Sequence, residues 1–132
     1  ISRNKIAIIY ATGTINSGKG DEKSIGSETT AKAIKQARED KNVKAIVFRI
    51  NSGGGSALAS DVIWRETILA KAEKPLVVSM GDYAASGGYY IACAADSIVA
   101  NPTTLTGSIG VFGMIPNLKK FYKNKLGITI DT

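Results

Sequence analysis

The stretch Pro75–Tyr90, PLVVSMGDYAASGGYY, decides the fold class of this chain. An apolar run, Pro75–Met80, leads into a glycine-rich turn and then into a helical pattern that begins at Gly87. A short continuous run of Val and Leu is typical of a buried parallel strand with both faces covered. Ser86 lies at the change from strand to helix, between two alanines and two glycines. The stretch therefore predicts a strand–turn–helix unit of an α/β protein with a serine at its turn.

The same alternation of patterns continues on both sides of this unit. Apolar runs predict strands, and amphipathic runs predict the helices between them. The predicted strands are Lys5–Tyr10, Val43–Ile50, Pro75–Met80, Ser97–Ala100 and Ser108–Phe112, and the predicted helices are Ser27–Asp40, Ala57–Ala72, Gly87–Ala95 and Asn117–Lys125. This order predicts an α/β fold with a mostly parallel sheet covered by helices. The polar, glycine-rich segment 10–27 is expected to be a mobile loop.

The composition is that of one globular domain, residues 1–132, and this domain is expected to be a fragment of a longer protein. The net charge of +6 arises from 17 Lys+Arg and 11 Asp+Glu. The charges are scattered and arginine is scarce, which favours a solvated surface over nucleic-acid binding. The single cysteine, Cys93, excludes an internal disulfide, and its apolar helical surroundings predict a buried structural thiol. No apolar run reaches the length of a membrane span, and no signal peptide is recognised, so this piece is expected to be soluble.

A second glycine-rich turn, Ile50–Ala57 or INSGGGSA, follows a neighbouring predicted strand. Since the carboxyl ends of parallel strands meet at one edge of a sheet, this turn and Ser86 are expected to lie together. Glycines let backbone N–H groups face a phosphate or an oxyanion. The spacing fits neither nucleotide-binding motif, so no cofactor and no metal are expected. A simple tight turn, and an N-cap role for Ser86, remain as alternatives.

Two segments carry a resemblance to a known family. INSGGGSALAS with its lead VKAIVFRI, and VVSMGDYAASGGYYIACAADSIVANPTTLTGSIGVFG, closely resemble the signal peptide peptidase A (protease IV) family of bacterial serine proteases. The resemblance covers nearly the whole chain and implies a ClpP/crotonase-type fold of repeated ββα units. It also implies hydrolysis of cleaved signal peptides and other membrane-associated peptides, and assembly into homo-oligomers. It places the full-length protein at the bacterial inner membrane, anchored there, with its catalytic domain facing the periplasm or the outside.

The resemblance also assigns site residues. Ser86 is implied as the nucleophile, and the backbone N–H groups of Gly54 and Gly87 as the oxyanion hole. Ser108, in LTGSIGV, matches the serine that supports the catalytic lysine of the family. Gly53 stands where the family often has proline, so the bend is expected to be less rigid than in those members.

The base is expected to come from outside this chain. The chain contains no histidine, and the family uses a Ser/Lys dyad. A lysine acts as a base only when it is neutral, which burial achieves. The lysines here begin strands, lie on polar helix faces or, as the outside alternatives Lys19 and Lys23, occupy the polar loop. The lysine is therefore expected downstream, as in short members of the family, or in a preceding half, as in tandem members. The isolated piece is expected to be inactive.

Two other functions fit the same residues. A crotonase-type acyl-CoA enzyme would use an oxyanion hole with a carboxylate, for which Asp82 is the candidate, and a non-catalytic assembly or binding module would keep the fold alone. For the protease, apolar substrates predict an apolar pocket beside the nucleophile, with Tyr83, Met114 and Ile115 as its wall. An extended peptide is expected to pair with a strand edge beside the glycine turn.

Overall fold

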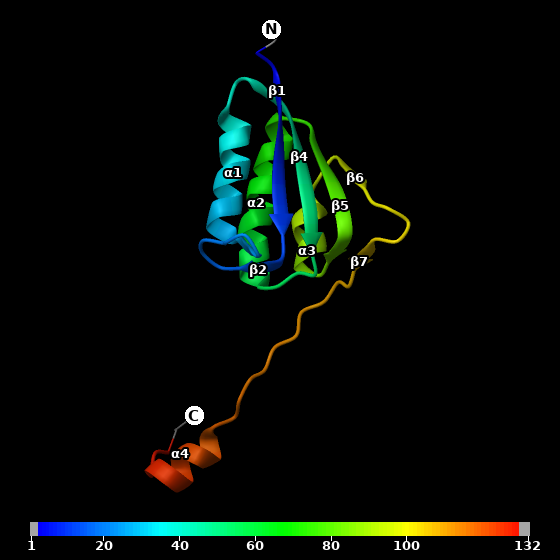
Figure 1. Ribbon diagram of the computed structural model, residues 1–132. Helices are drawn as coiled ribbons and strands as arrows, with labels where there is room; N and C mark the ends of the chain where they lie inside the picture. Colours follow the sequence, from blue (N-terminus) through cyan, green and yellow to red (C-terminus); the bar gives the residue numbers. More distant parts are fainter. Residues whose placement is uncertain (1–2, 130–132) are drawn as a thin grey trace.

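The predicted alternation of strands and helices is present in the computed structural model, which describes residues 3–129. The elements are β1 (Lys5–Thr12), β2 (Thr14–Asn16), β3 (Ser24–Gly26), α1 (Ser27–Glu39), β4 (Val43–Ser52), α2 (Ala57–Glu73), β5 (Leu76–Ala85), α3 (Gly87–Ala92), β6 (Ser97–Val99), β7 (Leu105–Gly107) and α4 (Lys119–Leu126). One layer is a sheet, and α1, α2 and α3 form a second layer against it (Figure 1). The α/β class predicted from the sequence is confirmed.

The main sheet is parallel throughout its described pairings. Its strand order is β1-β4-β5-β6. The short strand β7 also pairs with β5, at residues that follow those paired with β6. The register shifts between Ile50 and Ser52, so that Ser52 pairs with Ala84 of β5. Because the strands are parallel, the carboxyl ends of β4, β5 and β7 meet at one edge of the sheet. That edge brings together the two glycine-rich turns.

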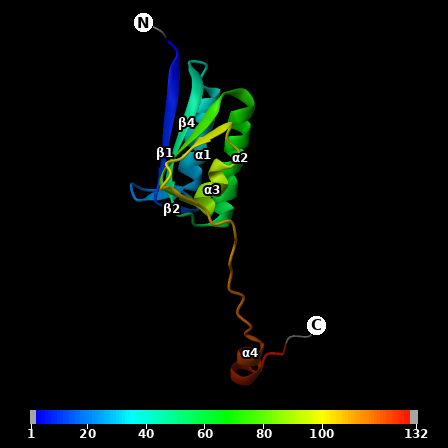
Figure 2. The ribbon, with the colours of Figure 1, turned by 90° about the vertical axis from the view of Figure 1, so that its right-hand side faces the viewer.

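The core lies between the sheet and its helices. Ile46, Phe48 and Ile50 alternate along β4 and are fully buried on the helical side. On the opposite face of the sheet, Ile8 and Tyr10 of β1 are 55% and 71% exposed. In residues 3–129, the helices that pack on the sheet lie on one side of it in both ribbon views (Figures 1 and 2). The expectation that both faces are covered is therefore wrong for this part of the chain, where the helices cover one face and leave apolar side chains of the other face exposed.

Two predicted segments differ from the structure. The expected mobile loop contains the parallel pair β2 and β3. The expected strand Ser108–Phe112 is an unpaired extended segment, and β7 precedes it. Gly107 and Ser108 have φ values of 77° and 51°, which are incompatible with a continuing strand. Beyond them the chain leads away from the sheet to α4 (Figure 2).

Within residues 3–129, no helix combines the length and the apolar character needed to cross a bilayer.

Phe48 provides a test of the one-sided core. Replacing the fully buried Phe48 with Ala should lower the free energy of unfolding by about 3–5 kcal/mol, because a large cavity is left behind. The neighbouring Val47, half-buried on the opposite face, is the control, and Val47→Ala should cost less than about 1.5 kcal/mol. Urea unfolding monitored by circular dichroism measures both. Equal losses would contradict the assignment of the core to the helical face.

Candidate active site

Ser86 lies at a strained bend between β5 and α3. Its backbone has φ 52° and ψ −120°, values that a residue with a side chain rarely adopts. Its N–H donates to the Gly107 carbonyl of β7 at 2.8 Å, and its carbonyl accepts from the Tyr90 N–H at 2.9 Å. Although Ser86 is the N-cap residue of α3, its side chain makes no capping hydrogen bond. The N-cap alternative therefore does not account for this serine, and its hydroxyl is available for chemistry.

Glycines around Ser86 allow the bends after β4 and β5 to touch. A Cβ on Gly54 would lie 2.7 Å from the Gly87 nitrogen and 2.9 Å from Ser86 Cβ. A Cβ on Gly87 would lie 2.5 Å from Ser60 Oγ, and one on Gly88 would lie 2.5 Å from the Ser52 carbonyl oxygen. Side chains at these positions would force the backbones apart. The expected meeting of Ser86 with the triple-glycine turn is therefore present.

The triple-glycine turn presents one of its amides to solvent and buries another. The Gly54 N–H donates to Ser52 Oγ at 3.1 Å, and Gly54 is buried. Gly55 is exposed and lines a cavity with Ser86 and Gly87. Among residues 3–129, neither the Gly55 N–H nor the Gly87 N–H has a protein acceptor. The amide predicted from the sequence, that of Gly54, is thus already hydrogen-bonded, and Gly55 is the better-placed donor.

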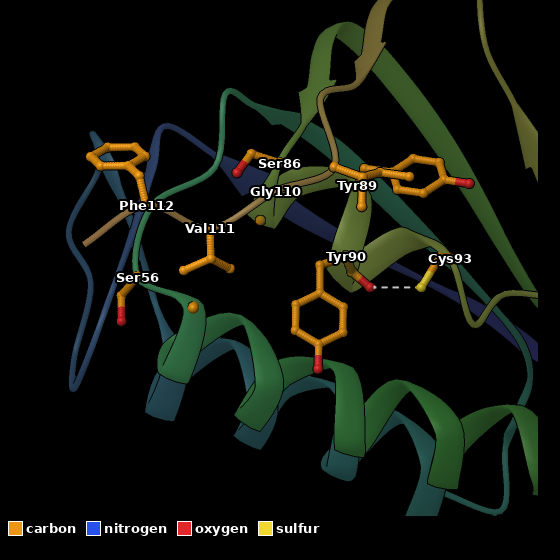
Figure 3. A pocket seen from close by; sticks show the side chains of 12 residues that line it. Ser56, Ser86, Tyr89, Tyr90, Cys93, Gly110, Val111 and Phe112 are labelled. Atoms are coloured by element: carbon orange, nitrogen blue, oxygen red, sulfur yellow. Dashed lines mark hydrogen bonds between the residues drawn. The ribbon is translucent and has the colours of Figure 1, made fainter.

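The cavity beside Ser86 has a volume of about 760 Å³ and a mainly apolar lining. Its walls come from the start of α2, from α3 and from the extended segment after β7 (Figure 3). The lining residues are Gly55, Ser56, Ala57, Ser86, Gly87, Tyr89, Tyr90, Cys93, Ile109, Gly110, Val111 and Phe112. A cavity of this size accommodates a large apolar side chain.

The residues predicted to form the pocket wall do not line this cavity. Tyr83 is 50% exposed, and Met114 and Ile115 are 91% and 95% exposed on the extended segment. Sequence reasoning instead missed Tyr89 and Tyr90. Together with Cys93, these follow Ser86 at i+3, i+4 and i+7, a spacing that places residues on one face of a helix and could have identified them.

Cys93 is exposed, contrary to the expectation of a buried thiol. It is the C-cap residue of α3, which ends at Ala92, and it borders the cavity instead of the core. Its Sγ lies 3.1 Å from the Tyr90 carbonyl oxygen and borders the cavity (Figure 3).

Tyr90 is held in place from α2. Its hydroxyl donates to Asp61 Oδ1 at 2.7 Å, and its ring packs at 5.6 Å from the Trp64 ring. The hydrogen bond to the Asp61 carboxylate raises the pKa of the Tyr90 phenol, because ionisation would break the bond and place two negative charges together. Tyr90 is therefore a fixed wall of the cavity.

Ser108 follows the end of β7 in the same way as Ser86 follows the end of β5. Ala85 and Gly107 are register partners of β5 and β7, and each is followed by one of the two serines. Ser86 and Ser108 are the non-glycine residues with positive φ in the described part of the chain. Both serines are thus presented by tight backbone bends at the same edge of the sheet.

Neither a lysine nor a carboxylate lines the cavity within residues 3–129. Lys19, Lys23 and Asp82 are exposed elsewhere. Lys74, the C-cap residue of α2, is half-buried. Its Nζ donates to the carbonyl oxygens of Ala37 and Asp40 at the end of α1. Residues 3–129 hold no cluster of three or more His, Cys, Asp or Glu side chains suited to a metal ion.

The sequence of this chain is similar to those of known peptidases. Residues 68–132 match the sequence model of peptidase family S49. The chain is 48% identical over 129 residues to Protease 4 of Haemophilus influenzae, covering 97% of this chain but only 21% of that relative. The chain therefore spans about a fifth of the length of this relative.

Two solved structures have the same fold. A variant of the 1510-N membrane-bound stomatin-specific protease, in complex with a substrate peptide, matches with a TM-score of 0.66 and 25% identity over 83% of this chain and 47% of that one. A ClpP1 variant from Listeria monocytogenes matches with a TM-score of 0.56 and 25% identity over 67% of this chain and 46% of that one. These likenesses confirm the predicted ClpP-type fold.

Titration of Tyr90 tests the geometry of the cavity wall. The Tyr90 phenol should ionise above its ordinary pKa of 10.0, and Asp61→Asn should lower its pKa because the carboxylate is removed. Since the folded-state pKa is raised, the stabilisation from this bond is complete below the unfolded-state pKa and is lost as pH rises through the folded-state pKa. Ultraviolet absorbance of tyrosinate, with Tyr90→Phe to identify the signal, measures the shift. An unchanged titration in Asp61→Asn would contradict the contact.

Proposed function

The chain belongs to peptidase family S49, and on that premise we propose that it carries the nucleophile of a signal-peptide-peptidase-type serine protease. The observation that carries the proposal is the setting of Ser86. Its hydroxyl is free of capping bonds, sits on a strained bend and opens into an apolar cavity beside two unengaged glycine amides. Strained backbone of this kind is concentrated at functional sites, because it is kept only where the surrounding structure imposes it.

In the proposed reaction, Ser86 Oγ attacks the carbonyl carbon of a peptide bond. The Ser86 proton passes to the base, and the carbonyl oxygen becomes an oxyanion that accepts hydrogen bonds from the N–H groups of Gly55 and Gly87. The base then gives the proton to the leaving amine, and water releases the acyl group from Ser86. We assign Gly55 to this role instead of Gly54, because the Gly54 N–H is bonded to Ser52 Oγ.

The base is proposed to be a lysine supplied by a part of the protein beyond this chain. Support comes from the absence of histidine and from the cavity, which no lysine lines in residues 3–129. A lysine brought against this apolar lining would be desolvated, which favours the neutral amine that a base requires. Ser108, which follows the register partner of Ala85, is proposed to accept a hydrogen bond from that amine, which leaves the lone pair of the amine for the Ser86 proton.

The proposed substrates are cleaved signal peptides and other apolar peptides. An apolar side chain of the peptide would fill the cavity between Tyr89, Tyr90 and the segment 109–112. A stomatin-specific protease of the same fold holds a substrate peptide, which supports peptides as the substrate class. The cavity lining lacks the carboxylate that an acyl-CoA hydratase would need, so the protease is favoured over that alternative.

The full-length protein is proposed to be a membrane-anchored homo-oligomer at the bacterial inner membrane, with the catalytic face toward the periplasm or the outside. Support comes from the similarity to Protease 4 and from the membrane-bound character of the stomatin-specific protease. The exposed apolar residues Phe112, Met114 and Ile115 offer surface that an adjacent copy could cover.

Substitution of Ser86 tests the proposed function. In the full-length protein, Ser86→Ala should lower kcat for an apolar peptide by about four to six orders of magnitude, because the nucleophile is lost. The same variant should lose covalent labelling by a fluorophosphonate probe. Hydrolysis is measured with a fluorogenic peptide, and labelling by mass spectrometry.

Ser97→Ala, an exposed serine on β6, is the matched control and should keep both activities. Retention of hydrolysis and labelling in Ser86→Ala would overturn the assignment of the nucleophile. Hydrolysis by residues 1–132 alone would overturn the assignment of the base to another part of the protein.

Filling the cavity tests the substrate site. Cys93→Trp should raise KM for peptides with a large apolar side chain at the cleaved bond by about tenfold, because the space for that side chain is occupied. KM for peptides with alanine at this position should change less than twofold. Ala94→Trp, one residue further and outside the lining of this cavity, is the control. An equal rise of KM for both peptides in Cys93→Trp would contradict the assignment.

A further inference from the structure

We propose that β2 is the positioning element of the oxyanion hole, and that the Ile15 backbone sets the direction of the Gly55 N–H. The inference rests on the proposed function, because it concerns the amide that would bind the oxyanion. Ile15 itself contacts no substrate in this proposal. It acts through the Gly54–Gly55 peptide group, which makes it a positioning residue.

Two backbone hydrogen bonds join Ile15 to the glycine turn. The Ile15 N–H donates to the Gly54 carbonyl at 2.9 Å, and the Ser56 N–H donates to the Ile15 carbonyl at 2.8 Å. These bonds form an isolated parallel bridge between Ile15 and Gly55. The bridge uses the carbonyl of Gly54 and the N–H of Ser56, so the N–H of Gly55 between them takes no part in it.

The direction of the Gly55 N–H follows from the geometry of the peptide group. In a planar trans peptide, the carbonyl of one residue and the N–H of the next point in opposite directions. Residues 3–129 contain no cis peptide bond. Because the Gly54 carbonyl points at Ile15, the Gly55 N–H points away from Ile15. The Gly55 nitrogen lies 3.3 Å from where a Cβ on Gly87 would stand, which places it beside the second proposed donor.

A second set of hydrogen bonds holds the peptide group between Gly53 and Gly54. Ser52 Oγ accepts from the Gly54 N–H at 3.1 Å and donates to the Gly13 carbonyl at 2.6 Å. The Gly13 N–H in turn donates to the Asn51 carbonyl at 3.0 Å. Both polar groups of Gly54 are therefore tied, directly or through Ser52, to the segment 13–15.

The glycine turn needs such an external restraint. Gly54 and Gly55 have φ values of 102° and 154°, and neither carries a side chain that could limit its rotation. An oxyanion hole is effective only when its donors are oriented before the charge develops. Ile15 is suited to supply that orientation, since its side chain is fully buried in the core and β2 is paired with β3.

The test compares equal truncations at two places in the core. In the full-length protein, Ile15→Ala should lower kcat by about tenfold or more and change KM less than twofold, because a misdirected amide weakens binding of the oxyanion more than binding of the substrate. Ile46→Ala removes the same atoms from an equally buried residue near the start of β4, remote from the turn. It should leave kcat within about twofold. Ile15→Val, which keeps most of the buried side chain, should retain most of the activity.

A structural readout separates this inference from the proposed function. The amide resonance of Gly55, followed by nuclear magnetic resonance in the same proteins, should shift in Ile15→Ala and stay in place in Ile46→Ala. Equal effects of both truncations on kcat, or an unmoved Gly55 resonance in Ile15→Ala, would overturn the positioning role. If the wild-type protein cleaves no peptide and takes up no fluorophosphonate, the proposed function fails, and the Gly55 resonance still decides whether β2 orients the turn.

Discussion

Two backbone bends, one after β4 and one after β5, approach so closely that a side chain at Gly54 would clash with Ser86 and Gly87. The contact of Gly54 with Ser86 and Gly87 has this character, since a single added carbon would lie within 3 Å of both partners. A parallel sheet makes such a contact possible, because it delivers the ends of adjacent strands to the same edge. The contact in turn requires the strained backbone of Ser86, whose N–H is bonded to the end of β7. The positions of Ser86 and of the glycine amides beside it thus depend on one close approach between two strand ends.

Much of this arrangement could be predicted from residue patterns. The runs of Val and Ile predicted β1, β4 and β5, and the spacing of apolar residues predicted α1 and α2, because burial repeats with the period of each element. The glycine turn and Ser86 could be expected to meet because both follow parallel strands. What local patterns could not show was which amide stays free, since this depends on Ser52 and Ile15. Those contacts join residues about 40 positions apart in the chain and leave no local signature.

The outer face of the sheet shows another limit of pattern reading. Apolar residues occur on both faces of β1, and this predicted a strand buried on both sides. In the described chain the helices cover one face and leave Ile8 and Tyr10 exposed. The sequence of a strand shows that one of its faces is apolar, but it does not show which other segment covers that face. The short strands β2 and β3 were hidden for a related reason, because three-residue strands within a polar, glycine-rich segment give no periodic signal.

The segment 109–112 forms one wall of the cavity, yet no hydrogen bond joins it to the remainder of the described chain. The opposite walls belong to α2 and α3, which the core holds rigidly. Substitutions in this segment can therefore reshape the recess without disturbing the serine or the glycine amides. Sequence variation in segment 109–112 could therefore change which side chains the cavity admits, while the strained bend at Ser86 and the glycine turn stay as they are.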